Sequence, residues 1–547
     1  MIAMGRERRP ALAWGCVCLA LCFGIAGNPA VADDGLAIGL FSSATGENSA
    51  AFGNYSAAGG ANSSAVGYWS QAGAVNSTAF GNYSLAAGDN STAIGIQSSV
   101  NAANGLALGN ASAVSGDNGM AIGLSSSAAG VNTAAVGNHS MASGENSVAI
   151  GLLSAANGAN SSAIGNRSIA SGSNSIAVGN SSAAKADNSS AFGNLAEASG
   201  GSSTAVGILS LAAGPNSTAV GNLSNASGDN GSAFGTLSTA VGANSTALGN
   251  LAAAAGDNAT AVGDQSTANG RVSAAFGALS AASGDNATAV GSHSEASGGQ
   301  SSAFGHAAVA SGQNSFAGGF GATASGGWTV AIGEASQATQ NGAVAIGQAA
   351  SATGADAIAI GRGAVATGSV AVGAGSQAAN GGAAFGDNAV ATGTNSTAVG
   401  PNSSATAANS AAIGNGSVAT EPGTVSVGAP GSERRITNVA AGTAPGDAVN
   451  MQQFQSGLAD VNSRINDVNV EARRGIAAVA ALAPVIMPSA RGRTTFSFNS
   501  GYYRNQIGVG VGLAHRLDTK LPLVVHGAYA NGGGREHIGR AGVAVEF

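Results

Sequence analysis

Charged and aromatic residues are scarce in this chain of 547 residues, at 8% and 4% of the total. So few ionisable and aromatic side chains are not typical of a globular enzyme. Proline is scarce too, with 10 residues against 88 glycines. Collagen is therefore excluded, since it needs abundant proline and a glycine at every third position. The composition favours a repetitive β architecture instead.

Cysteine is absent from all but the first 22 residues, where Cys16, Cys18 and Cys22 lie. The same segment has the layout of a secretory signal peptide: three arginines, an apolar run over residues 11–27, and a small-residue motif at 30–32. We expect cleavage after Ala32, because the run is too short and too interrupted by glycine to stay as a membrane helix. The mature chain would then have neither disulfides nor thiol metal sites.

Basic residues are rare between residues 33 and 430, where 17 acids and 4 bases give a formal charge of 4 − 17 = −13. A surface of this sign argues against nucleic acid as a partner. Residues 431–547 hold 8 acids and 12 bases, a formal charge of +4.

An Ala-hydrophobic-Gly tripeptide recurs with its glycine every 14 residues, from Gly39 to Gly361. The interval (361 − 39)/14 = 23 gives 24 glycines in register, and the residue before the glycine is aliphatic or Phe everywhere except Gly318. The spacing then becomes 12 (Gly373) and 13 (Gly386) before it returns to 14. Such a period is the signature of a stacked repeat protein.

The full unit reads Asn-Ser-x-Ala-Φ-Gly-x-x-Ser-x-Ala-x-Gly-x, as in the repeat around Gly95. Its fixed Gly, Asn and Ser positions predict two short strands joined by tight turns. Ala93 and Gly95 would point to one face and Thr92 and Ile94 to the other. We expect the stacked aliphatic column to form an apolar core that other coils or chains cover. About 28 coils at roughly 4.8 Å each would build a rod on the order of 130 Å long.

Acidic residues in the Gly-Asp-Asn segments are interpreted as turn residues and not as calcium ligands; they are Asp89, Asp117, Asp229 and Asp285. His139, His293 and His306 are dispersed along the repeats, and we expect exposed positions, not a metal site. The glycines from Gly508 to Gly512 have no following helix, so nucleotide binding is not expected. No cofactor, metal or catalytic residue is predicted.

These repeats resemble the heads of trimeric autotransporter adhesins of the YadA type, which implies a left-handed parallel β-roll in a homotrimer. The stretches 435–443 and 447–454 resemble the family's neck, with Asn438, Val439, Gly442, Asp447, Ala448, Val449 and Asn450 as the matching residues. The resemblance implies a head over 33–430, a neck over 431–450, a coiled-coil stalk over 451–485 and a membrane anchor over 486–547.

Independently of the resemblance, apolar or small residues follow Asp447 at alternating spacings of 3 and 4, from Met451 to Leu482. This seam predicts a coiled coil without fixing its number of helices, and a monomeric amphipathic helix is the alternative. Asp447 is the predicted cap of the helix N-terminus.

Four stretches of about ten residues near the C-terminus are long enough to cross a membrane as tilted strands. They are 494–503, 506–516, 521–530 and 538–547, and they alternate apolar with polar or small residues. Because four strands cannot close a membrane barrel, three chains would supply 4 × 3 = 12. The resemblance implies that Phe547 is read by the outer-membrane assembly machinery and that Gly501 gives room to the threading chain. Asn499 departs from the family, where a further glycine is usual.

The resemblance thus implies an adhesin on the outer membrane and cell surface that supports its own export. Its partners would be membrane lipid and an extracellular-matrix or cell-surface ligand, bound through many weak contacts whose avidity adds up. The alternative is a secreted carbohydrate-active enzyme on a β-helix, which would need a local break in the repeat with clustered charged residues. Within the repeats the basic residues Arg167, Lys185, Arg271 and Arg362 are far apart in sequence.

Overall fold

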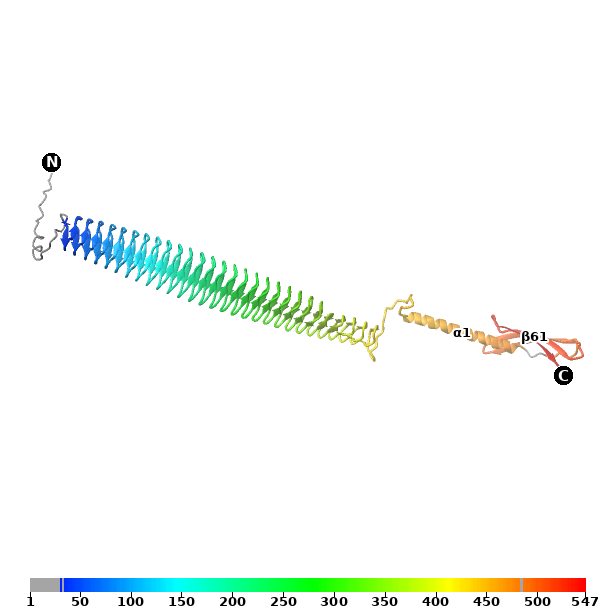
Figure 1. The fold of residues 1–547 in the computed structure, drawn as a ribbon. Helices are drawn as coiled ribbons and strands as arrows, with labels where there is room; N and C mark the ends of the chain where they lie inside the picture. The colour runs from blue at the N-terminus through cyan, green and yellow to red at the C-terminus, as the bar shows by residue number, and fades with distance from the viewer. Residues whose placement is uncertain (1–29, 32–33, 483–485) are drawn as a thin grey trace, which may run out of the picture. The chain divides into compact units, whose positions relative to one another are not determined.

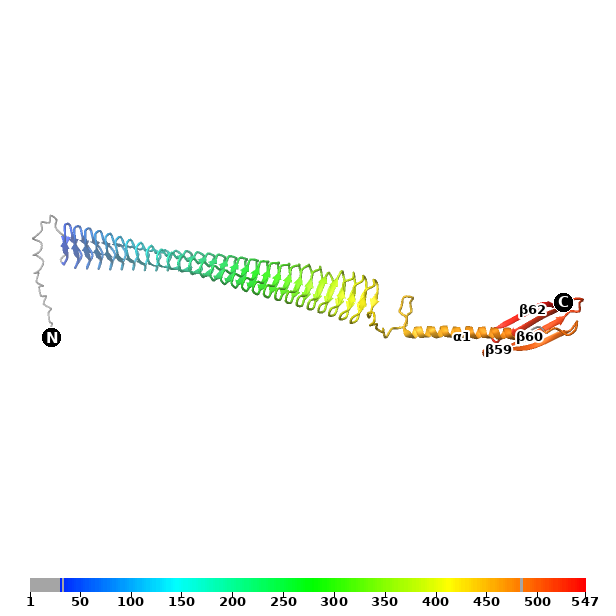
Figure 2. The same cartoon turned by 90° about the horizontal axis from the view of Figure 1, so that it is seen from below.

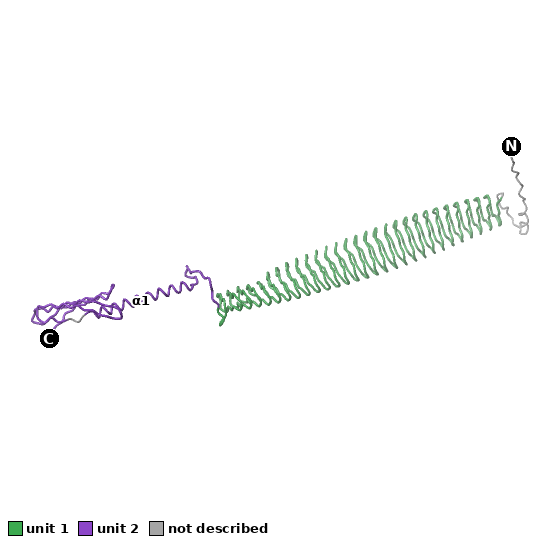
Figure 3. Tube along the Cα trace, turned by 180° about the vertical axis from the view of Figure 1, so that it is seen from behind, with its two compact units in different colours: residues 1–433 green, residues 434–547 purple. Residues whose placement is uncertain are grey.

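The computed structural model describes residues 30–31, 34–482 and 486–547, and the chain divides into two compact units, 1–433 and 434–547 (Figure 3). The predicted signal peptide lies almost entirely outside the described residues. Its described part, β1 (Ala30–Val31), pairs in parallel with β3 (Ser43–Ala44). Cleavage after Ala32 stays a prediction.

The first unit is a β-solenoid of about 28 coils, each with one strand of three residues and one of two (Figure 1). The even-numbered, three-residue strands run from β2 (Leu36–Ile38) to β56 (Ala411–Ile413) and are followed by β58 (Val425–Ser426). The odd-numbered strands run from β3 to β57 (Val418–Ala419) and have two residues, except β49 (Val365–Thr367) and β51 (Gln377–Ala379). The predicted two-strand coil is confirmed.

Equivalent strands of neighbouring coils pair in parallel. In β10 (Thr92–Ile94) and β12 (Leu106–Leu108), for example, Ala93 faces Ala107. Where the sequence spacing changes, the register changes with it: Ala359 faces Ala371 twelve residues on, and Ala371 faces Ala384 thirteen residues on. Each coil therefore adjusts its turn length while the core column stays in line.

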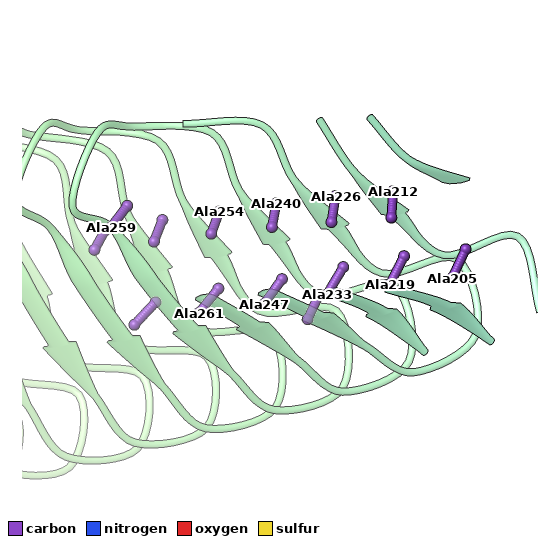
Figure 4. Packing of buried hydrophobic residues seen from close by; sticks show 14 of the residues in the cluster. Ala205, Ala212, Ala219, Ala226, Ala233, Ala240, Ala247, Ala254, Ala259 and Ala261 are labelled. Carbon is purple, nitrogen blue, oxygen red and sulfur yellow. The ribbon is translucent and has the colours of Figure 1, made fainter. Parts of the chain in front are cut away.

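The core of each coil is made of alanine and serine, not of the aliphatic column. In nearly every strand one alanine points inward and is fully buried, as Ala219 and Ala226 are (Figure 4). Val100 and Val114 take this place in β11 (Ser99–Val100) and β13 (Ala113–Val114). Buried serines three residues after the register glycine donate to its carbonyl, as Ser98 Oγ does to Gly95 O at 3.0 Å. The aliphatic residues lie on the outer face of the three-residue strands, half-buried or exposed. Within one chain the aliphatic column therefore lies outside the coil, whose narrow core holds alanine, serine and, at two places, valine. Its cover by other chains stays a prediction.

The register glycines have a positive φ and lie directly against the next coil. Gly207 has φ of 133°, and a Cβ there would overlap the carbonyl oxygen of Gly221. This backbone conformation is open almost exclusively to glycine. Two requirements therefore fix glycine at every fourteenth residue: the positive φ, and the lack of room for a Cβ beside the next coil.

The opposite turn carries asparagines in the left-handed region, where this residue is tolerated. Their amides form a ladder in which each Nδ2 donates to the Oδ1 of the asparagine one coil on, at 2.8–3.3 Å; the members are Asn62, Asn76, Asn90, Asn104, Asn118, Asn132, Asn146, Asn160, Asn174 and Asn188. Asp89 and Asp117 accept the backbone N–H of Val75 and Ala103 in the preceding coil. These acids therefore act in the turns, as predicted.

The second unit contains α1 (Met451–Ala481) and a four-stranded antiparallel sheet (Figure 2). The strands in order are β59 (Thr494–Tyr503), β60 (Gln506–Arg516), β61 (Leu523–Asn531) and β62 (His537–Val545). The first two coincide with the predicted strands, and the others agree within two residues. Among the described residues, no helix has both the length and the apolar character that crossing a membrane requires.

Candidate functional site

The outer face of the three-residue strands is an apolar stripe along the head. Ile38, Phe80 and Leu248 are about half exposed there, at 50%, 53% and 48%. Every repeat but the one with Gly318 contributes an aliphatic or Phe side chain to this position. In a single chain the stripe has no cover, which makes it a surface for association.

A second apolar feature, here called the aromatic ridge, lies on the first four turns after the register glycines. It consists of Phe41, Tyr55, Trp69 and Tyr83, each with φ of 55–60°. Ring centroids of successive coils are 5.1 Å apart for Phe41 and Tyr55 and 4.8 Å apart for Tyr55 and Trp69, with nearly parallel planes. All four are exposed.

The ridge is costly for the fold alone. A bulky residue in the left-handed region is strained by about 1–2 kcal/mol, and these four side chains remain 37–55% exposed although their rings stack on one another. The opposite turn of the same coils uses asparagine, which tolerates this conformation. The aromatic side chains therefore indicate contact with something outside the coil.

The same turn position changes character along the head. It carries exposed leucines farther on, at Leu195, Leu209, Leu223, Leu237 and Leu251. Near the irregular coils it carries Ala335, Ala349, Gly363 and Gly375, which leave an open groove of about 610 Å³ also lined by Glu334, Arg362 and Asp387. Glu334 accepts from Gln348, and Asp387 accepts from the Ala374 backbone N–H. These carboxylates therefore hold neighbouring coils together.

The prediction that the head histidines stay apart was wrong for two of them. His293 and His306 are 13 residues apart in the sequence, but the 14-residue coil places them side by side, with ring centroids 5.5 Å apart. His139 occupies the same turn position as His293, many coils away. The missed signal was coil geometry: a separation near the period means adjacency.

The predicted neck residues surround the start of α1. Asn450 caps the helix: its Oδ1 accepts the Gln453 N–H at 2.9 Å, and its Nδ2 donates to Val439 O at 3.1 Å. The Gln453 side chain bonds both the N–H and the carbonyl of Gly442. Asn438 has φ of 61°, and Val449, next to Ala448, is exposed.

Asp447 does not cap the helix, contrary to the prediction. Its carboxylate accepts the N–H groups of Thr443 and Ala444, at 2.8 and 2.9 Å, and so closes the loop before the helix. Three residues further on, Asn450 is the residue at the helix start. Asp and Asn both suit such turns, so sequence alone does not separate the two roles.

We expect the neck loop to lose this closure in acid. The N–H groups of Ala444 and Thr443 lower the pKa of Asp447 below its ordinary value. Because the folded chain lowers the pKa of this carboxyl, the ionised carboxylate stabilises the loop at pH values above the ordinary carboxyl pKa. That stabilisation is lost as the pH falls through the lowered pKa of the folded chain. Hydrogen exchange at the Thr443 and Ala444 amides, corrected for intrinsic rates, should show protection at neutral pH that is lost only once the pH has fallen below the ordinary carboxyl value.

Asp447→Ala should remove that pH dependence and leave the amides unprotected throughout. Equal protection in the variant and the original chain would contradict the assigned role.

α1 presents an apolar seam without a partner in the single chain. Phe454, Leu458, Val461, Ile465 and Val468 are all at least 49% exposed. Their spacing of 3 and 4 is the pattern of a coiled coil, whose seam is covered by other helices.

The last turns of α1 lie against the sheet mainly through small residues, with one hydrogen bond from Arg474 Nε to Gln506 Oε1 at 3.1 Å. Ala477, Ala478 and Ala481 are fully buried. A Cβ at Gly501 would lie 2.6 Å from the carbonyl oxygen of Ala477, and one at Gly508 would overlap the same group. The predicted residue Gly501 is thus joined by Gly508 and by Gly510, whose place in the predicted strand 506–516 did not indicate a contact with the helix.

The other face of the sheet is apolar and exposed. It carries Phe496, Phe498, Tyr502, Ile507, Val509, Leu513, Val525, Tyr529 and Val543. Phe547, the predicted recognition residue, follows β62 and is fully exposed. The sheet therefore has a small-residue face toward the helix and an apolar face suited to lipid.

Comparison with known proteins agrees with this arrangement. The YadA head domain repeat matches in successive copies from residue 30 to residue 403, and the coiled stalk of trimeric autotransporter adhesins matches residues 435–477. The autotransporter adhesin NhhA of Neisseria meningitidis serogroup B is 33% identical over 105 residues, which are 19% of this chain and 17% of that protein. The chain thus matches less than a fifth of that relative's length.

Among solved structures, the collagen-binding domain of the Yersinia adhesin YadA is 28% identical, with 40% of this chain and 85% of that one covered and a TM-score of 0.15. The head repeats alone match well over half of the residues, and the stalk follows them in the order expected. The chain belongs to the trimeric autotransporter adhesin family.

Proposed function

We propose that this protein is a homotrimeric adhesin, anchored in the outer membrane, whose head attaches the cell to a matrix, a surface or sister cells. Family membership implies a binding role and not an enzymatic one. The observation that carries the adhesive role is the aromatic ridge, a row of stacked and exposed rings at a strained turn position.

Three exposed apolar surfaces on one chain support the trimer: the outer stripe of the head, the seam of α1 and the open sheet β59–β62. The sheet has two free edges, at β59 and β62, and free edges in lipid leave backbone groups unpaired. Twelve strands from three chains would remove them. The α1 seams would then meet at the centre, as a coiled coil requires.

We infer the following division of labour. Residues 1–32 are a cleaved signal peptide, 33–430 the adhesive head, 431–450 the neck, 451–485 the stalk and 486–547 the anchor that supports export of the rest. Gly501 leaves room for the chain within the anchor, and Phe547 serves recognition by the outer-membrane assembly machinery. The neck contacts of Asn450 with Val439 support a role in joining head and stalk.

The test uses cells that display the full chain, probed on immobilised fibrillar collagen, on polystyrene and by sedimentation of sister cells. Deletion of residues 33–430 should abolish attachment while the anchor stays trimeric on an unheated denaturing gel. Tyr55→Asn with Trp69→Asn should lower attachment about tenfold, which corresponds to about 1.4 kcal/mol of binding free energy. Asparagine keeps the turn, because Asn388 and Asn402 occupy the same position with φ of 55°.

Leu209→Asn with Leu223→Asn is the matched control, with the same substitution at the same turn position. If both double variants lose attachment equally, the aromatic ridge is not the adhesive surface. Unchanged attachment after deletion of the head would show that adhesion resides elsewhere.

A further inference from the structure

Two imidazoles from neighbouring coils meet on the surface of the head. His293 lies on the left-handed turn position of its coil, with φ of 59°, and His306 lies one residue earlier in the turn of the next coil. Both side chains are exposed. Their ring centroids are 5.5 Å apart and their planes are inclined by 45°.

This separation fits two imidazoles that share one metal ion. A zinc-to-nitrogen bond of about 2.0–2.1 Å places each ring centroid about 3.2 Å from the ion, and a tetrahedral angle then puts the centroids about 5 Å apart. The observed distance is close to that value. The spacing of the two rings therefore suits a shared ion, and ligation would require both side chains to rotate so that one nitrogen of each ring faces it.

Neighbouring groups already restrain both rings. Ser292 Oγ lies 2.9 Å from His293 Nδ1. In the tautomer whose Nδ1–H donates to this hydroxyl, the lone pair of Nε2 is open to a metal. The ring of His306 stacks on Phe320, with centroids 5.2 Å apart and planes 8° apart. A hydrogen bond at the second ring nitrogen is the usual means by which proteins fix the tautomer of a metal-binding histidine.

The charge around the pair favours a cation. Between Arg271 and Arg362 the sequence has no lysine or arginine. Glu295 begins β39 (Glu295–Ala296), directly after the turn of His293, and Glu334 has the turn position of His306 two coils on. A negatively charged surface region raises the local concentration of cations.

We propose that His293 and His306 form a surface site for a divalent transition metal of the Zn²⁺, Ni²⁺ or Cu²⁺ class, which imidazole ligands suit. Each chain supplies one site with two protein ligands. The remaining coordination positions are open to water or to a donor group of a molecule in contact with the head. The site is independent of the aromatic ridge, which lies on other coils.

The experiment titrates the purified full-length protein with Ni²⁺ by calorimetry and records the Cu²⁺ form by electron paramagnetic resonance. The original chain should show a class of sites with one metal per chain and coupling to two imidazole nitrogens. His293→Asn and His306→Asn should each lower the metal affinity of this site by at least about tenfold. That factor is the loss found when a residue that only hydrogen-bonds a metal ligand is removed, and removal of the ligand itself should cost no less. Asparagine suits the left-handed position of residue 293.

His139→Asn is the matched control, since it removes a histidine from the same turn position in a distant coil, and it should leave this class unchanged. The proposal fails if either pair variant binds like the original, if His139→Asn weakens binding equally, or if all binding is weak and unsaturable, which would mean adventitious binding only.

Discussion

Gly207→Ala is expected to open the head at one coil, with a loss of about 2–6 kcal/mol in local opening free energy from backbone strain and overlap together. The new Cβ would overlap the carbonyl oxygen of Gly221 while φ stays at 133°. Because each coil contacts only its neighbours, the damage should stay near residues 193–221. Hydrogen exchange with peptide resolution on the full-length protein measures it.

Gly201→Ala is the matched control, six residues earlier in the same region. A Cβ there meets nothing within 4 Å, and its φ is not positive. It should be neutral or stabilise by up to about 1 kcal/mol, through the lost freedom of the unfolded chain. If both variants exchange alike, contact between coils is not what fixes the glycine column.

Gly508→Val is expected to prevent α1 from seating on the sheet and so to abolish the assembled anchor. Its side chain would be forced into the backbone of Ala477, which, unlike a flexible side chain, cannot move aside. The measurement is the band near three times the mass of one chain, from outer membranes run on a denaturing gel without heating. We expect that band to disappear and the single chain to remain or be degraded.

Gly539→Val tests the same sheet without that contact. Gly539 lies on β62 with nothing within 4 Å of an added Cβ, on the face that already carries Tyr529 and Val543. It should assemble as the original does. A Gly508→Val protein that forms as much of the large band as Gly539→Val would show that close approach of helix and sheet is not needed for assembly.

The period and the turn chemistry made the coils predictable from the sequence. The Ala-Φ-Gly tripeptide located every three-residue strand up to β48 (Ile358–Ile360), and the spacings of 12 and 13 located the irregular coils. Alternation of side chains separated Ala93 from Ile94 correctly. It did not say which of the two faced inward, because that depends on the width of the coil, which admits alanine and excludes isoleucine.

The candidate site was less predictable, because it depends on contacts between residues far apart in the chain or on neighbouring coils. His293 and His306 meet only through the stacking of coils. The contact of Gly508 with Ala477 depends on how the helix lies along the sheet, which no local pattern reveals. Asp447 and Asn450 exchanged roles because both belong to the residues that close turns and cap helices.

The asparagine ladder has an evolutionary consequence. Each of its amides bonds to an identical residue one coil away, so removal or duplication of a whole coil leaves the new neighbours with the same bonds as the old ones. Recombination between repeats of the coding sequence would shorten or lengthen the head in frame, with no new contact to optimise. The ladder thus allows the head to change its length while the bonds between its coils stay the same.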